Sequence, residues 1–460
     1  MQINDMKYSF CRILFFFLLV YSYPSIASIS YLNWSTNKYS KFTNYFEGLI
    51  DSSGIRKKEA NLNSEENAGL KLPAGFSALL VADKIGPARH LAVSSKGNIY
   101  IKLADSSANS SIKVYGNIGK NGESNLIQSF ADYGGTGIAI KNGFLYASSN
   151  TDIYRYHLDP DGKITNPKTP DHLVYGLLER GEHESKSITL DNAGNIYVNI
   201  GAYSNACQIQ DRQKGSPSYD PCPILDSAGG IWRFKADVLN QTYKEGLHYG
   251  KGIRNVVGLD WNTQTNQLFV MQHGRDQLHD MFPDRYNFKS SAELPAEEMF
   301  IVKPGKEYGW PYCYYDPMQH KKVLSPEYGG DGKIVGRCAN AENPVISFPA
   351  HMAPNGLLFY KGNMFPEKYK NGAFIAFHGS WNRAPEPQKG YFVVFVPFEN
   401  GKPTGKWEVF ADNFAGIDLV KSPGQAKHRP CGLAEGPDGS LYVSDDHAGS
   451  IYRISYNKKL

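Results

Sequence analysis

The sequence predicts an all-β fold, a six-bladed β-propeller. Its 460 residues include 45 glycines, 26 prolines and 30 tyrosines, a composition that favours turns and strands over long helices. Six segments share one strand–turn–strand pattern, and such internal repetition is the sequence signature of propeller blades. A chain of this length exceeds the roughly 150 residues typical of one domain, unless the fold grows by repetition. One large propeller therefore accounts for the whole body of the chain.

Each repeat has a short apolar strand, a Gly or Asn turn, and a second strand that begins with an apolar and an aromatic residue. The six are LAVSSKGNIYIK (91–102), IAIKNGFLYAS (138–148), ITLDNAGNIYVNI (188–200), LDWNTQTNQLFVM (259–271), YKNGAFIAF (369–377) and LAEGPDGSLYVSD (433–445). Third strands follow several of them, as in TDIYRYHLD, GGIWRFKAD and GSIYRISYN. A pair of β-sandwiches is the alternative, but it requires no such shared pattern.

The N-terminus has the pattern of an export signal. Lys7 and Arg12 precede the apolar stretch ILFFFLLVY, and small residues near Ala27 suit cleavage, so residues 1–27 are predicted to be a signal peptide. The alternative is an uncleaved anchor. Residues 28–68 are polar and aperiodic and are expected to form an irregular extension before the propeller domain, 69–460. The protein is therefore expected to be periplasmic or secreted, with no membrane span in the mature chain.

Cysteine usage agrees with an oxidising compartment. We predict disulfides Cys207–Cys222 and Cys313–Cys338, because each pair closes a short loop rich in Pro, Gly or Asp, and Cys431 is then left over. No CxxC spacing supports a zinc site. The formal charge, 49 − 45 = +4, is too small to indicate a nucleic-acid surface.

Polar clusters lie beside the predicted blade strands, where propellers carry their functional loops. They are GPARHLA (86–92), GEHESKSIT (181–189), GIRNVVGLDW (252–261), FPAHMAPNG (348–356), HGSWNR (378–383) and HRPCGLA (428–434). Five of the six immediately precede an apolar strand at the start of a blade unit. We therefore expect them on one rim, facing one axial pocket.

Five motifs resemble the glucose/sorbosone dehydrogenase family of soluble quinoprotein sugar dehydrogenases: RNVVGL, YGWPYCYYDP (308–317), PAHMAPNGLLFY, HGSWNR with VVFVPFENGKP, and RPCGLAEGPDGSLYVSDD. The likeness is greatest to the L-sorbosone and pyranose dehydrogenase branch, and it covers roughly residues 70–456. It implies a six-bladed propeller that binds pyrroloquinoline quinone (PQQ) and Ca²⁺ and oxidises a sugar or an aldehyde.

The candidate residues make chemical sense of that resemblance. PQQ is a flat ortho-quinone with three carboxylates, and arginine binds carboxylates through its planar fork. The arginine candidates are Arg89, Arg254, Arg429 and Arg383, and the alternative for each is an ordinary surface ion pair. The family's glucose branch carries a cofactor-binding lysine in the fifth-blade hairpin. This chain lacks it, so that role would fall to Arg383, to Lys389 or to no residue.

The family implies a catalytic base and a cofactor wall. His183 matches the catalytic histidine and would take the proton of the sugar hydroxyl, with His351 as a rival that lines the cofactor pocket. Arg254 and Asn255 match an Arg-Asn pair, and the arginine would stabilise the reduced quinone. Trp381 and Asn382 would wall the cofactor site.

Calcium is implied on main-chain carbonyls of a loop that reads QHGRDQLHD (272–280), at Gly274 and Arg275. The Gly-Pro of the glucose enzymes is absent here. An arginine beside the ion would repel it unless its side chain turns away. Glu297 and Glu298 are candidates to assist.

The sequence leaves three functions open. The first is a PQQ-dependent sugar dehydrogenase whose electrons leave to an external acceptor, a cytochrome or a quinone, because no CxxCH haem site is present. The second is a calcium-dependent lactonase. The third is a cofactor-free extracellular propeller that binds glycans. Nothing in the sequence selects the sugar.

Overall fold

The computed structural model describes residues 65–105, 110–116, 118–119 and 122–457. The chain divides into two units, Met1–Glu59 and Ala60–Leu460, and every described residue lies in the second. The predicted signal peptide and nearly all of the predicted extension thus fall outside the described residues. Residues Glu66–Gly69, at the end of that extension and the start of the predicted domain, form a short 3-10 turn, η2.

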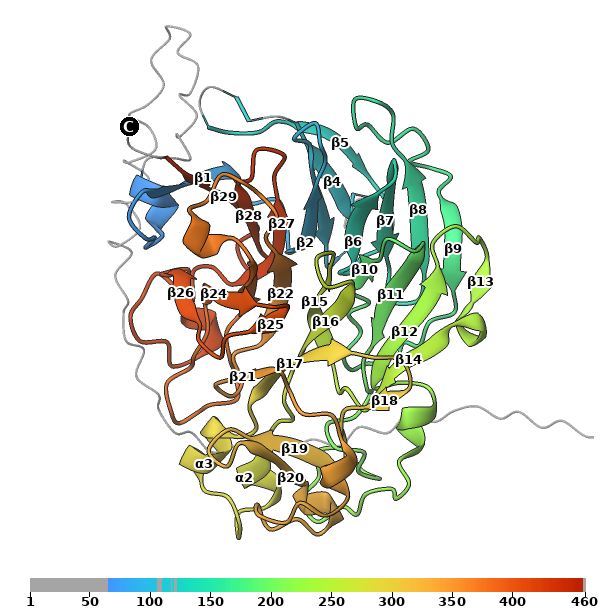
Figure 1. The fold of residues 1–460 in the computed structure, drawn as a ribbon, viewed down its shortest axis with the longest axis vertical. Helices are drawn as coiled ribbons and strands as arrows, with labels where there is room; N and C mark the ends of the chain where they lie inside the picture. Colours follow the sequence, from blue (N-terminus) through green and yellow to red (C-terminus); the bar gives the residue numbers. More distant parts are fainter. Residues whose placement is uncertain (1–64, 106–109, 117, 120–121, 458–460) are drawn as a thin grey trace, which may run out of the picture. The chain divides into compact units, whose positions relative to one another are not determined.

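Six antiparallel sheets surround a central axis, so the predicted six-bladed propeller is confirmed (Figure 1). Blade 1 consists of β2 (Ala88–Val93), β3 (Ile99–Leu103), β4 (Ile112–Tyr115) and β5 (Leu126–Phe130), and blade 2 of β6 (Ile138–Lys141), β7 (Phe144–Ser148), β8 (Ile153–His157) and β9 (Asp171–Tyr175). Blade 3 consists of β10 (Ile188–Leu190), β11 (Asn195–Ile200), β12 (Gly230–Lys235) and β14 (Leu247–Lys251), and blade 4 of β15 (Val256–Asn262), β16 (Gln267–Gln272), β17 (Glu297–Val302) and β21 (Ile346–Phe348). Blade 5 consists of β22 (Pro354–Phe359), β23 (Gly372–Phe377), β24 (Phe392–Glu399) and β26 (Glu408–Ala411), and blade 6 of β27 (Pro430–Glu435), β28 (Leu441–Asp445), β29 (Ile451–Tyr456) and β1 (Phe76–Ala82).

The first strand of each blade is the innermost one. Neighbouring inner strands contact one another in a closed ring, β2 to β6 to β10 to β15 to β22 to β27 and back to β2. Short strands extend three blades: β13 (Gln241–Thr242) pairs with β9, β18 (Lys306–Glu307) with β14, and β25 (Lys402–Pro403) with β24. This ring places the loops at each end of the inner strands around one axis.

The sixth blade joins the two ends of the described chain, because β1 pairs antiparallel with β29. Phe76 of β1 packs edge-on against Phe365, Tyr369 and Phe410, with ring centroids 4.9 to 5.3 Å apart. Edge-to-face aromatic contacts of this kind stabilise beyond their buried area. The ring of blades is thus closed by main-chain hydrogen bonds and an aromatic cluster.

The first four predicted repeats and the sixth each coincide with the inner hairpin of a blade. The fifth repeat in chain order, 369–377, does not. The segment 369–377 contributes only β23, whose inner partner is the earlier strand β22. The connection between them contains a 3-10 turn, η8 (Glu367–Tyr369), in place of a tight hairpin. The repeat pattern found the strand but not its partner, because that partner lies before a long connection.

Two insertions within blade 4 lie together and are called the inserted segment below. The first, between β16 and β17, contains α2 (Leu278–Met281) and α3 (Phe288–Glu293), and the second, between β17 and β21, contains the hairpin β19 (Cys313–Asp316)–β20 (Lys321–Leu324). Residues of both insertions share a small apolar core. Both predicted disulfides are confirmed, Cys207–Cys222 and Cys313–Cys338, and Cys431 is a buried free thiol.

The other 3-10 turns of the described residues are η4 (Pro223–Asp226), η5 (Tyr243–Glu245), η6 (Pro326–Tyr328), η7 (Gly336–Asn340) and η9 (Pro423–Gln425).

Candidate functional site

A polar cavity of about 360 Å³ lies where loops from several blades meet, within the size range of small-molecule sites. Seven residues named from the sequence line it: His183, Arg254, Gly274, Glu297, His351, Trp381 and Asn382. They come from loops far apart in the chain. Four of the six predicted clusters, 181–189, 252–261, 348–356 and 378–383, contribute to its lining, and 86–92 and 428–434 do not.

His183 lies on the loop between β9 and β10 with a left-handed backbone, φ 52°. Its Nδ1 donates a hydrogen bond to the Ala202 carbonyl oxygen, which fixes the proton on Nδ1 and leaves the lone pair on Nε2. Burial, aided by the positive charge of Arg254, lowers the pKa of His183 to about 3. The imidazole is therefore neutral at ordinary pH, with Nε2 able to accept a proton.

The His183 loop approaches the start of the β11–β12 connection very closely. A Cβ on Gly201 would lie 2.5 Å from the Cβ of His183 and 2.9 Å from Oδ1 of Asn255. Asn255 itself is buried outside the cavity lining, and its Oδ1 accepts from Nδ2 of Asn199 at 3.2 Å. In the structure Asn255 thus supports the loops behind the cavity wall.

Arg254 is buried, and every part of its guanidinium group is engaged. It pairs with Asp276 at 2.8 Å and donates to the carbonyl oxygen of Gly274 at 3.0 Å and to Oδ1 of Asn205 at 3.0 Å. Arg212 also pairs with Oδ2 of Asp276, at 3.1 Å. Although burial alone raises the pKa of Asp276, Arg254 and Arg212 hold it well below its usual range.

Two further histidines and a glutamate complete the cavity. His351 has a structural role, since its Nε2 lies 2.9 Å from the carbonyl oxygens of both Ser291 and Leu294. His273 is partly buried, and desolvation together with the charge of Arg254 lowers its pKa to about 3. Glu297 accepts from the main-chain N–H groups of Gly274 and Ala353, yet burial raises its pKa to about 7. Glu297 is therefore the carboxyl group here that titrates near neutrality.

Trp381 and Asn382 line the outer part of the cavity. Trp381 remains 54% exposed, so its indole face is free to stack on a flat ligand. The amide Nδ2 of Asn382 donates to Oδ1 of Asp276 at 3.2 Å.

Arg89 and Arg429 lie on blades 1 and 6, outside the cavity lining. Arg89 pairs with Asp446 at 2.6 Å and donates to Ser185 at 3.1 Å. Arg429 donates to the carbonyl oxygens of His378 and Gly379. Among the ion pairs of the described residues none joins Arg429 to a carboxylate, so it keeps an uncompensated charge.

Arg383 and Arg275 point away from the cavity. Arg383 is 2% exposed, pairs with Glu293 of α3 at 2.5 Å, and shares that carboxylate with Lys389. Arg275 pairs with Glu327 at 2.5 Å. The structure uses both arginines to attach the inserted segment to the rim, a role that no local pattern in the sequence signals.

The oxygen atoms at the expected calcium loop are not arranged to bind a cation. The carbonyl oxygen of Gly274 already accepts from the guanidinium of Arg254, and Arg212 and Arg275 add positive charge nearby. Glu298 is turned away, paired with Lys322 at 3.2 Å. Within residues 65–105, 110–116, 118–119 and 122–457, no cluster of three His, Cys, Asp or Glu side chains could hold a metal. Hard cations need several free oxygen ligands, which this loop does not offer.

The cavity does fit a planar anionic ligand. Arg212, with 26% of its side chain exposed, and Asn382 supply donors, and Trp381 supplies a stacking surface. Sequence reasoning missed Arg212, Asn205, Asp276 and His273. Asp276 and His273 lie in the loop quoted for calcium, so the loop was found but its acid and imidazole were not. Arg212 lies inside a disulfide-closed loop whose direction no local pattern predicts.

A family model described as TrAA12-like matches residues 70–457. The chain is 25% identical over 434 residues to an uncharacterised protein of Borreliella burgdorferi, covering 91% of this chain and 99% of that protein. It is 29% identical over 233 residues to a pyrroloquinoline quinone-dependent pyranose dehydrogenase of Coprinopsis cinerea, covering 45% of this chain but only 31% of that enzyme's length.

Solved structures support the fold. The holo PQQ domain of the Coprinopsis cinerea pyranose dehydrogenase superposes with a TM-score of 0.65 at 20% identity, covering 84% of this chain and 97% of that one. A calcium structure of a Trichoderma reesei enzyme of carbohydrate-active family AA12 gives 0.67 at 18% identity, covering 86% and 99%.

Proposed function

Because the chain belongs to the TrAA12-like family, we propose that it is a PQQ-dependent dehydrogenase that oxidises a sugar. The observation that carries the proposal is His183. Its Nδ1 is fixed by the Ala202 carbonyl, and its Nε2 lone pair is free in a polar cavity beside Arg254 and Trp381. That is the arrangement required of a base acting on a hydroxyl group.

The chain's own side chains would hold the cofactor. Arg212, whose side chain is partly exposed, would attract its carboxylates, Trp381 would stack on its ring, and Asn382 would donate a hydrogen bond. Arg429, with its uncompensated charge, is the further candidate on the same rim. When bound, PQQ supplies an ortho-quinone that accepts a hydride from the sugar carbon.

His183 takes the hydroxyl proton at Nε2 in this proposal. With a pKa of about 3 the imidazole is a weak base when only Arg254 is nearby. Negative charge brought into the cavity favours the protonated imidazole and raises this pKa toward neutrality. Binding of an anionic ligand such as PQQ would therefore make His183 a stronger base for the reaction. Arg254, held in place by Asp276, supplies fixed positive charge where negative charge develops.

Location and electron acceptor follow from the same proposal. The two disulfides suit a periplasmic or secreted enzyme. No helix of the described residues is both long and apolar enough to cross a membrane. The electrons would pass to an external cytochrome or quinone.

The central test is a titration of the protein with PQQ, followed by a panel of aldoses. We expect saturable binding seen in quinone absorbance, then reduction of the bound quinone by at least one sugar. Absence of binding by the folded protein would refute the proposal.

Calcium removal is expected to change little. The guanidinium of Arg254 already donates a hydrogen bond to the carbonyl oxygen of Gly274, so this oxygen is not expected to bind calcium. Excess EGTA should therefore leave the melting temperature, measured by thermal unfolding, and the PQQ affinity, measured by absorbance titration, unchanged. A loss of several degrees, restored by added calcium, would show that the loop rearranges around an ion.

A second function is favoured by one observation. Arg254 and Arg89 are each already paired with a carboxylate, Asp276 and Asp446, so these two arginines have partners without an anionic cofactor. A cofactor-free propeller that binds acidic glycans would show such pairing. Retention on immobilised glycans without quinone binding, unchanged by His183→Ala, would support it.

A further inference from the structure

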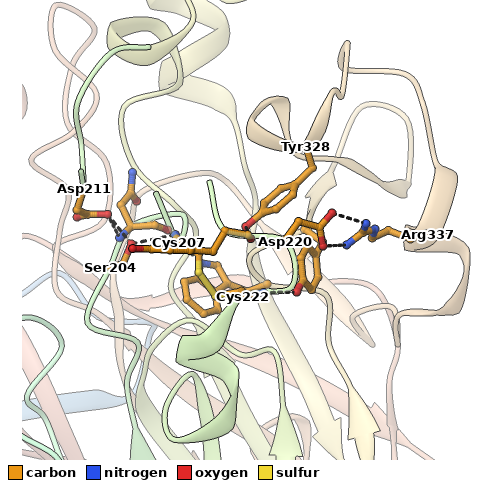
Figure 2. Close-up of a disulfide and its surroundings, with 11 residues drawn as sticks. Ser204, Cys207, Asp211, Asp220, Cys222, Tyr328 and Arg337 are labelled. Atoms are coloured by element: carbon orange, nitrogen blue, oxygen red, sulfur yellow. Dashed lines mark hydrogen bonds and ion pairs between the residues drawn. A yellow bond between two sulfur atoms is a disulfide. The ribbon is translucent and has the colours of Figure 1, made fainter. Parts of the chain in front are cut away.

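The Cys207–Cys222 disulfide closes a loop between β11 and β12 that reaches the cavity (Figure 2). At its base, Oδ1 of Asp211 accepts from Oγ of Ser204 at 2.5 Å and from the N–H of Asn205 at 2.8 Å. The N–H of Tyr219 donates back to the Cys207 carbonyl at 3.1 Å. These contacts, with the disulfide, hold the loop together at its base.

The outer side of this loop is attached to the inserted segment that carries the second disulfide. Figure 2 shows Asp220 paired with Arg337, and the two hydrogen bonds measure 3.0 and 2.7 Å. The hydroxyl of Tyr328 donates to the Tyr219 carbonyl at 3.2 Å. Two disulfide-closed segments thus brace one another beside the cavity.

The inner side of the loop presents Arg212, which has a left-handed backbone, φ 57°. Its guanidinium spans three partners from two loops: Glu182 at 3.0 Å in one, and the neighbouring residues Asp276 at 3.1 Å and Gln277 at 2.9 Å in the other. Glu182 precedes His183, and Asp276 pairs with Arg254. Arg212 therefore connects the histidine loop to the Arg254–Asp276 pair.

Asn205, at the start of the same loop, is fully buried and holds the same groups from behind. Its Oδ1 accepts from Arg254 at 3.0 Å and from the N–H of Asp276 at 2.9 Å, and its Nδ2 donates to the Asp276 carbonyl at 3.0 Å. The β11–β12 connection thus contacts Asp276 through two residues, Asn205 and Arg212.

We propose that Arg212 is a positioning residue that fixes Asp276 and the Gly181–His183 loop relative to each other, and that the Cys207–Cys222 disulfide holds it there. This rests on the proposed function only for the identity of the ligand. A guanidinium that joins two carboxylates from different loops defines their separation, because bidentate and shared ion pairs are directional. Without it, two like-charged carboxylates would repel each other and the loops would separate.

The test compares Arg212→Ala and Arg212→Lys with the wild type, and uses Arg453→Ala, which removes another carboxylate-paired arginine on β29, as the control. The pKa of Asp276 is measured in the ligand-free protein by carbon NMR of labelled aspartate, and PQQ affinity by titration. We expect the Asp276 pKa to rise by about one unit in Arg212→Ala, since one of its two guanidinium partners is lost. PQQ binding should weaken about tenfold.

Chemical rescue separates positioning from general damage. Arg212 lies at the partly exposed edge of the cavity, so millimolar guanidinium should restore PQQ affinity to Arg212→Ala and leave the affinity of Arg453→Ala unchanged. The double variant Cys207→Ser/Cys222→Ser should reproduce the loss of affinity. An unchanged Asp276 pKa in a folded Arg212→Ala variant would overturn the proposal. If that pKa rises but even the wild type fails to bind PQQ, the positioning role stands and the proposed function fails.

Discussion

Replacing His183 by glutamine is expected to lower kcat of sugar oxidation by about 10²- to 10⁴-fold, the typical contribution of a positioned general base. Glutamine fills similar space and can still hydrogen bond to the Ala202 carbonyl, but it cannot accept a proton at the position of Nε2. PQQ affinity should change far less than kcat. Single-turnover reduction of the bound quinone, followed by absorbance, measures the step directly.

His157→Gln is the matched control, because His157 lies on β8 with its side chain 48% exposed and paired with Asp171. It should leave kcat unchanged. Equal turnover by wild type and His183→Gln would remove His183 from the chemistry and direct attention to Glu297, whose pKa of about 7 also suits proton transfer.

Replacing Asp276 by asparagine is expected to cost about 3–5 kcal/mol of unfolding free energy. It removes the only charge that neutralises Arg254 among the ion pairs of the described residues, and it leaves that buried guanidinium uncompensated beside Arg212. Urea denaturation of wild type and variant measures the difference. Asp220→Asn is the control, since its partner Arg337 and Asp220 itself are each 46% exposed, and such surface pairs contribute less than about 1 kcal/mol.

The pH dependence gives an independent check of the Asp276 pair. The folded pKa of Asp276 is depressed, so its stabilisation is complete above the unfolded value of about 3.9 and is lost as the pH falls below it. The asparagine variant should lose less stability than wild type over that acid range. Parallel loss in both proteins would show that the pair does not stabilise the fold.

The sequence by itself determined the fold and half of the cavity. Repeated strand–turn–strand patterns are local and do not depend on where the propeller axis lies, so their periodicity identified the blades. Short cysteine spacing likewise indicated both disulfides. His183, Trp381 and Asn382 were found because their loops match a family pattern, and the structure gathers them around one cavity.

Only the tertiary structure decided which charges meet. Arg383 and Arg275 looked like site residues but pair with Glu293 and Glu327 of the inserted segment, which no pattern near either arginine signals. Arg212 and Asp276 are 64 residues apart in the chain and form one ion pair. An ion pair depends on the distance between side chains brought together by separate loops, and that distance is a property of how the blades pack. For this reason the local sequence specifies the strands, and the closed ring of blades specifies the electrostatics of the cavity.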